Sequence, residues 1–166
     1  MGLEAAGKGV SGSFSLHAVV YVSRATRVQH ATEAECIAQI LAISARNNAA
    51  NAVTGALLAC DGWFVQVLEG RRIDVECTLR RIERDPDHCQ IRRLSAGPIA
   101  VRSFPDWNMC ASVFTSTDEQ IVRVLAGSGM FDPAALVAAS AMRLLLSVAH
   151  LQGRMAPQAA RRSAGS

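Results

Sequence analysis

The sequence is poor in features that would point to several common classes of function. Its only lysine is Lys8, the arginines are spread among acidic residues, and the formal net charge is only +3. Nucleic-acid-binding proteins usually concentrate positive charge on one surface. No nucleic-acid partner is therefore expected.

Disulfide, metal and membrane signals are also weak. The five cysteines include no Cys-x-x-Cys pair and their number is odd, which predicts no disulfide scaffold and no metal site and favours reduced thiols in the cytoplasm. The apolar run from Ala134 to Leu151 is interrupted by Ser140, Arg143 and His150. A central arginine disfavours a membrane span, so no membrane partner is expected.

Arrangements typical of catalysis are missing as well. We find no Ser-His-Asp or Cys-His set, and no pair of carboxylates at a suitable spacing. There is no glycine-rich nucleotide loop of the Rossmann type. The sequence does not predict an enzyme.

What is present is a folded chain, since half of the 166 residues are hydrophobic. Hydrophobic periodicity, a capping box at Thr32–Glu35 and turn residues place the main elements. We expect strands at 16–23, 53–60, 63–69, 91–100 and 108–114, and helices from Thr32 to about Asn48 and at 73–84. This order predicts an α+β fold, a ferredoxin-like split βαβ sandwich with a five-stranded mixed sheet and two helices on one face.

The rest of the chain is expected to cover the other face. Ser116–Glu119 is a second capping box, which predicts a helix to about Leu125. Asp132-Pro133 is expected to cap a helix at 134–151 that is apolar nearly all round, and so is buried on more than one side. The predicted organisation is a flexible start (1–14), a domain (15–115), a helical extension (116–152) and a flexible tail (153–166).

The stretch 44–70 organises the domain. Asp61-Gly62 between two apolar strands predicts a tight hairpin turn. Gln66 interrupts the second of these strands, and a buried amide without a partner costs roughly 1–3 kcal/mol. Gln66 is therefore expected either to face solvent or to have a partner inside the fold.

Alternation along the strands indicates what that partner is. Tyr21 shares a face of its strand with Ser23, and Gln66 shares a face with Phe64. In the predicted topology these two strands are the central neighbours, so the phenol and the amide should lie side by side.

Other side chains are expected to lie near this pair. Trp107 and Met109 share parity on the last strand, and Asn48 ends the first helix. This set suits holding a flat, hydrogen-bonding heterocycle better than covalent catalysis.

Each of these residues also has an ordinary interpretation when taken alone. Tyr21, Trp107 and Met109 would be core residues. Asn47 and Asn48 would form a helix C-cap, because asparagine tolerates left-handed geometry. Only the joint spacing favours a functional site.

On that spacing the sequence resembles the BLUF domain, the sensor of blue light that uses FAD. The resemblance covers roughly residues 16 to 113, and the last fifty or so residues are similar to the helical extension of short BLUF proteins without an effector domain. The matching pieces are Val20 to Arg24, Asn48, Val53 to Leu57, Gly62 to Gly70, Ile82 through Asp85 to His88, and Arg102 to Met109.

The resemblance implies a role for each matching residue. Tyr21 would be the electron and proton donor to the photoexcited flavin, and Gln66 would bridge the phenol to flavin N5 and O4. Asn48, with Asn47 beside it, would hold the pyrimidine edge. Trp107 and Met109 would be the exchangeable pair that relays the change to the last strand. Positions near the ribityl and phosphate part would be Arg81, Asp85 and His88.

One position departs from the family pattern. The family often has arginine just before the histidine matched by His88, whereas this chain has Asp87. The outer phosphates would then be held loosely, so FMN or riboflavin could replace FAD.

The predicted function is a blue-light photoreceptor that signals to a separate protein or changes its own assembly, with a dimer through the C-terminal helix as the default. Three alternatives stay open: a flavin-dependent redox enzyme, a flavin-free ferredoxin-like oligomerising or ligand-binding module, and a BLUF fold that has lost its photocycle.

Overall fold

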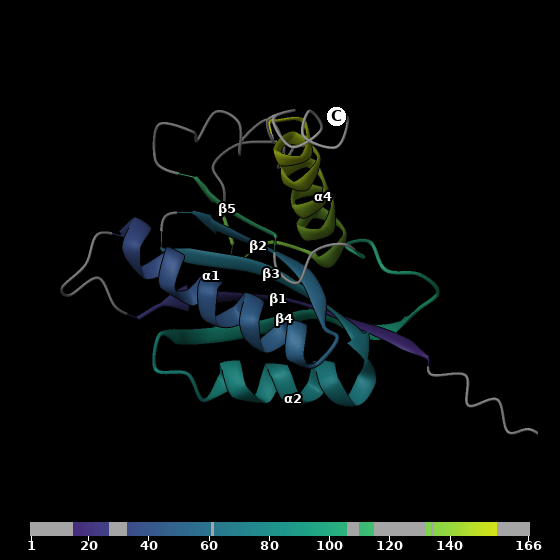
Figure 1. Cartoon of the computed structure of the whole chain (residues 1–166). Helices are drawn as coiled ribbons and strands as arrows, with labels where there is room; N and C mark the ends of the chain where they lie inside the picture. The colour runs from purple at the N-terminus through teal and green to yellow at the C-terminus, as the bar shows by residue number, and fades with distance from the viewer. Residues whose placement is uncertain are drawn as a thin grey trace, which may run out of the picture.

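The structure is a computed structural model that describes residues 15–26, 33–60, 62–105, 110–114, 132–133 and 135–155. Its elements, in chain order, are β1 (Leu16–Ala25), α1 (Glu33–Ala50), β2 (Thr54–Cys60), β3 (Trp63–Arg71), α2 (Arg72–Glu83), β4 (His88–Ile99), β5 (Cys110–Phe114) and α4 (Ala138–Met155). The predicted α+β class is confirmed (Figure 1).

One sheet organises these elements, with the strand order β4-β1-β3-β2-β5. β1 lies between β3 and β4 and is antiparallel to both, whereas β5 is parallel to β2. In the β1–β3 register, Tyr21 is directly opposite Gln66. The predicted adjacency of these two strands is confirmed.

Helices cover both faces of the sheet (Figure 1). On one face, Ile40 of α1 packs on Leu57 and Phe64, while Val75 and Leu79 of α2 pack beside Tyr21. On the other face, α4 packs against residues of opposite parity. Two helices on one face and a C-terminal helix on the other agree with the sequence prediction.

Several predicted boundaries were wrong. β3 extends to Arg71, past the predicted end at 69, because its pairing with β1 continues to that residue, and α2 begins at Arg72 rather than at 73. β4 begins at His88 rather than Ile91, because its pairing with β1 reaches Ala25. Two register shifts interrupt that pairing, and Gln90, near one of them, has a positive φ of 49°.

The start of the C-terminal helix was also predicted wrongly. Asp132 and Pro133 do not begin it, and α4 starts at Ala138. The Arg92 guanidinium donates to the carbonyl of Pro133 at 2.9 Å and to that of Leu136 at 3.2 Å. The Asp132 and Pro133 carbonyls accept the N–H groups of Ala135 and Leu136, at 3.2 and 3.4 Å, so this pair forms turns before the helix. The helix also extends to Met155, past its predicted end at 151. The helix predicted at 116–125 lies outside the described residues.

Two glycines are required by the backbone. Gly62 has φ +73° in the β2–β3 hairpin, as the turn chemistry predicts, while Asp61 lies outside the described residues. Gly55 packs so tightly on β3 that a Cβ there would lie 2.0 Å from the Val67 carbonyl oxygen. Among the helices of the described ranges, none is long and apolar enough to cross a membrane.

Candidate functional site

The central pair of the site is Tyr21 on β1 and Gln66 on β3. Tyr21 is fully buried and Gln66 is 3% exposed. The Tyr21 hydroxyl donates a hydrogen bond to Oε1 of Gln66. Gln66 therefore has a partner inside the fold rather than a place on the solvent face, and the predicted meeting of phenol and amide is confirmed.

Burial keeps this phenol protonated. Desolvation strongly raises the pKa of Tyr21, and the negative charge of Asp85 raises it further. At neutral pH the hydroxyl is therefore a donor. Because Oε1 of Gln66 accepts that bond, the amide nitrogen of Gln66 is turned away from the phenol.

A second polar pair lies next to the first. Ser23 follows Tyr21 on the same face of β1, is fully buried, and its Oγ is hydrogen-bonded to Nδ1 of His88 at 2.9 Å. The His88 ring also lies against Phe64, with 5.0 Å between ring centroids. His88 thus belongs to this face of the sheet.

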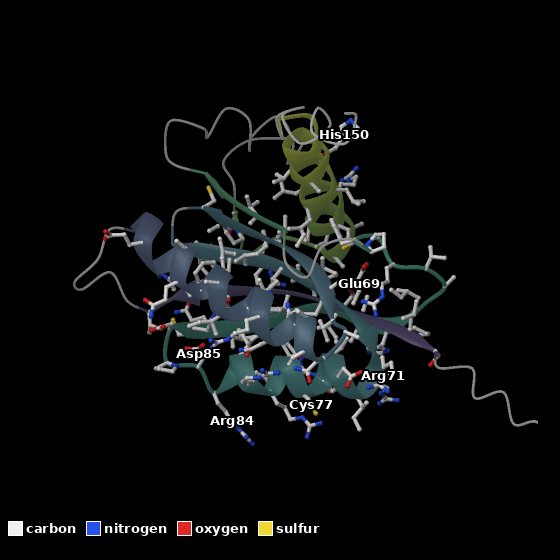
Figure 2. The ribbon with its side chains drawn as sticks, in the orientation of Figure 1. Glu69, Arg71, Cys77, Arg84, Asp85 and His150 are labelled. Atoms are coloured by element: carbon white, nitrogen blue, oxygen red, sulfur yellow. The ribbon has the colours of Figure 1, made fainter. Side chains whose placement is uncertain are left out.

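The turn between α2 and β4 fixes the position of His88. Asp85 Oδ1 accepts the Asp87 N–H at 2.9 Å, and the Asp85 carbonyl accepts the His88 N–H at 3.1 Å. Desolvation lowers the pKa of His88, and the charges of Asp85 and Asp87 partly oppose that effect. The imidazole is neutral at pH 7. Figure 2 shows Asp85 at this turn and the neighbouring Arg84 pointing away from the sheet.

The two adjacent asparagines lie inside α1 rather than at a C-cap. Asn48 is buried, and its carbonyl accepts the N–H groups of Asn51 and Val53 at 3.1 and 3.0 Å. The residue with left-handed geometry is Ala52, at φ +51°. The C-cap interpretation is therefore wrong, and Asn48 places a buried amide in the helix that covers the Gln66 face.

Of the remaining predicted residues, Arg81 and Asn47 lie in the described part of the chain, and neither side chain forms a hydrogen bond or ion pair with this group there. Arg81 is exposed on α2. Asn47 is half-buried, and its carbonyl accepts Nδ2 of Asn51 at 2.7 Å. Trp107 and Met109 lie outside the described residues.

The apolar packing on this face divides where the polar residues lie. Along β3, Phe64 belongs to the cluster under α1 and Leu68 to the cluster under α2, with Gln66 between them. Along β1, Ser23 separates Tyr21 from Ala25 in the same way. A phenol, two amides, a hydroxyl and a neutral imidazole on one face fit a flat heterocycle that carries both donors and acceptors.

Metal chemistry has no comparable support. In the parts of the chain that the structure describes, no group of three or more His, Cys, Asp or Glu side chains is placed to hold a metal ion. Cys60, Cys77 and Cys89, among the described cysteines, form no disulfide bond.

Sequence reasoning missed two charged residues on the other face. Glu69 is 1% exposed, and its carboxylate accepts the backbone N–H groups of Ser103 and Phe104 at 3.1 and 3.0 Å. Arg102 donates to Thr54 Oγ1 and to the carbonyls of Glu69 and Ala52. The signal was available, because alternation places Glu69 with the buried Val65 and Val67.

Comparison with protein families finds a match to the family described as BLUF, sensors of blue light using FAD, over residues 16–110. The match spans β1 to the start of β5 and so contains every site residue described above.

Curated relatives carry the same kind of region within much longer proteins. The photoactivated adenylate cyclase subunit beta of Euglena gracilis is 33% identical over 110 residues, which cover 64% of this chain and 12% of the relative. That of Euglena longa is 31% identical over 103 residues, 61% of this chain and 12% of the relative. This chain therefore matches only a small part of those proteins.

A solved structure matches over nearly its whole length. BlrB, a BLUF protein in its dark state, superposes with a TM-score of 0.65 at 27% identity, covering 83% of this chain and 97% of BlrB.

Proposed function

The chain belongs to the BLUF family, the sensors of blue light using FAD, and from this we propose that it is a blue-light photoreceptor whose flavin lies against Tyr21 and Gln66. The observation that carries the proposal is the buried hydrogen bond from the Tyr21 hydroxyl to Gln66 Oε1. This hydrogen bond supports a switch because it lies on the face of the sheet under α1 and α2, where the apolar packing is divided into two clusters.

In this proposal the bound flavin supplies the absorption of blue light and an acceptor for one electron. Tyr21 would supply that electron together with the proton on its hydroxyl, and the existing hydrogen bond would lead the proton to Gln66 Oε1. Electron and proton would both return to Tyr21 on recombination, so the cycle would have no net chemical product. This argues for a sensor rather than an enzyme.

Gln66 is the group whose hydrogen bonding would stay changed after the electron and proton have returned to Tyr21. A half-turn or a tautomerisation of its amide exchanges donor and acceptor positions beside the phenol. Exchanging one or two hydrogen bonds is worth about 1 kcal/mol each. Typical coupling between sites is about 1–3 kcal/mol, so this change is large enough to shift a two-state equilibrium.

Other side chains are proposed to hold the flavin. Asn48 would bind the pyrimidine edge of the ring with its buried amide, and Asn47 would support it. His88, Asp85 and the exposed Arg81 are proposed for the outer part of the molecule, where Asp87 stands in place of arginine. FAD is the proposed ligand, and FMN or riboflavin are weaker candidates.

An absorbance spectrum before and after blue light tests the proposal. The flavin-loaded chain should show a small, reversible red shift, and Tyr21→Phe and Gln66→Leu should each abolish it. Gln39→Leu, at an exposed position of α1, is the matched control and should shift normally. A normal shift in either site variant would refute the assigned mechanism.

A labelling experiment isolates the phenol. Tyr21 is the only tyrosine of the chain, so fluorotyrosine incorporated throughout changes this one site. Fluorination makes the phenol more acidic, and the rate of return to the dark state should change. A chain that stays colourless with excess flavin would favour a flavin-free module, and a coloured chain with unchanged absorbance would indicate a lost photocycle.

The output is proposed to pass from the sheet, of ferredoxin-like split βαβ type, to β5 and α4. Part of α4 and the residue before it remain available for another protein or a second copy, since Leu146 is 43% and Val137 61% exposed. We take a dimer through α4 as the default. Leu146→Glu should weaken it, which sedimentation measures.

A further inference from the structure

We infer that Glu69 and Arg102 are positioning residues that connect the flavin face of the sheet to the core under α4. We call one group of atoms the junction. It consists of the side chains of Glu69, Arg102 and Thr54 and the backbone of Ala52, Ser103 and Phe104. This inference rests on the proposed function, because it concerns how the light-induced change leaves the site.

The junction holds Glu69 from two directions. Its carboxylate accepts the N–H groups of Ser103 and Phe104, and its carbonyl accepts a bond from Arg102 at 2.7 Å. A buried carboxylate is strongly unfavourable unless such donors are supplied. The segment 102–104 is therefore fixed to the end of β3 (Figure 2 labels Glu69 there).

The same guanidinium reaches the end of α1. Arg102 donates to the Ala52 carbonyl and to Thr54 Oγ1, each at 2.8 Å. Between them, Val53 is bonded through its N–H to the Asn48 carbonyl and packs in the cluster that contains Tyr21. Arg102 thus binds the short piece of backbone that follows the helix carrying Asn48.

Beyond the junction lies the other core. Phe104, whose N–H is bound by Glu69, is buried in one cluster with Leu136, Leu144 and Leu145. Glu69 itself is three residues from Gln66 on β3 but faces the opposite side of the sheet. A change in β3 at Gln66 would therefore reach Phe104, and the helix packed on Phe104, through the hydrogen bonds of the junction.

Hydrogen exchange measured by mass spectrometry on the flavin-loaded chain, in darkness and under blue light, tests this. Wild type should show a red shift and a light-dependent change of exchange in residues 135–155. Glu69→Gln should keep the red shift, lose most of that exchange difference, and exchange Ser103 and Phe104 on the order of tenfold faster in darkness, because bonds to a charged group are lost.

Arg102→Gln is the second variant, since it keeps the carboxylate and its two backbone donors. It should give the same separation of red shift from α4 response even if Glu69→Gln does not fold. The matched controls are Glu83→Gln and Arg93→Gln, which remove a 2.7 Å ion pair at the surface and should respond as wild type.

The two ways of failing are distinct. Absence of a red shift in the wild-type chain would refute the proposed function. A normal red shift together with a wild-type exchange difference in residues 135–155 of Arg102→Gln would overturn the role of the junction while leaving the photoreceptor proposal intact.

Discussion

The face of the sheet under α4 carries one continuous apolar cluster, whereas the face under α1 and α2 carries two clusters with polar side chains between them. Side chains along each strand point alternately to the two faces, so Val65 and Val67 lie on the face under α4 and Gln66 lies on the other. Continuous apolar packing stabilises the fold most per residue. The face under α1 and α2 has less of this packing because hydrogen-bond donors and acceptors occupy part of it, which is the usual pattern at a functional site.

The largest expected loss of stability comes from a substitution in the apolar core under α4. Leu144→Ala removes a fully buried side chain and should lower the free energy of unfolding by about 2–5 kcal/mol, which urea unfolding measures. Leu146→Ala, on the same helix but 43% exposed, is the control and should change it much less. Equal losses in the two variants would contradict the packing of α4 on the sheet.

The next effect tests the divided face with a double-mutant cycle. Gln66→Leu leaves the buried Tyr21 hydroxyl without its acceptor and should cost about 1–3 kcal/mol. Tyr21→Phe combined with Gln66→Leu removes both partners and should come close to wild-type stability while the light response is lost. If the two single losses simply added, Tyr21 and Gln66 would not be coupled.

A smaller effect depends on pH. The lowered pKa of His88 means that the unfolded chain binds this proton first as the pH falls. The contribution of His88 to the free energy of unfolding is therefore fully present above about pH 6.5. It is lost as the pH falls toward the folded-state pKa, by at most about 1.4 kcal/mol per pH unit. Urea unfolding at several pH values should show this slope, and His88→Gln should reduce it. His150→Gln, at an exposed position, should not.

The smallest effect lies outside both faces. Arg93 and Glu83 form an exposed ion pair between β4 and α2. Such pairs contribute about 0–1 kcal/mol and are screened by salt. Arg93→Gln should change the unfolding midpoint slightly, and less at high salt. A loss as large as that of Leu144→Ala would mean that this surface matters more than either face.

Much of this architecture was predictable because it depends on local chemistry. Alternation along 16–23 and 63–69 predicted two central strands and placed Tyr21 beside Gln66, and Asp61-Gly62 predicted the hairpin. The resemblance to the family rested on the same residues. These signals need only neighbouring residues in the chain to be read.

Other features had no local signal. The register shifts in β4 and the positive φ of Gln90 depend on how that strand pairs with β1. Before the late start of α4, Arg92 donates to the carbonyl of Pro133, which is 41 residues away in the sequence. An Asp-Pro pair ordinarily begins a helix, and here its two carbonyls accept the N–H groups of Ala135 and Leu136 in turns that precede the helix.

By itself the sequence determined the class of fold, the two faces of the sheet and the pairing of a phenol with an amide, since strand period and turn residues act over a few positions. Only the tertiary structure decided that Ser23 meets His88 and that a buried Glu69 holds the backbone of Ser103 and Phe104. Those partners are 65, 34 and 35 residues apart. Contacts at such separation depend on strand register and on the cost of burying each polar group, which no short stretch of chain encodes.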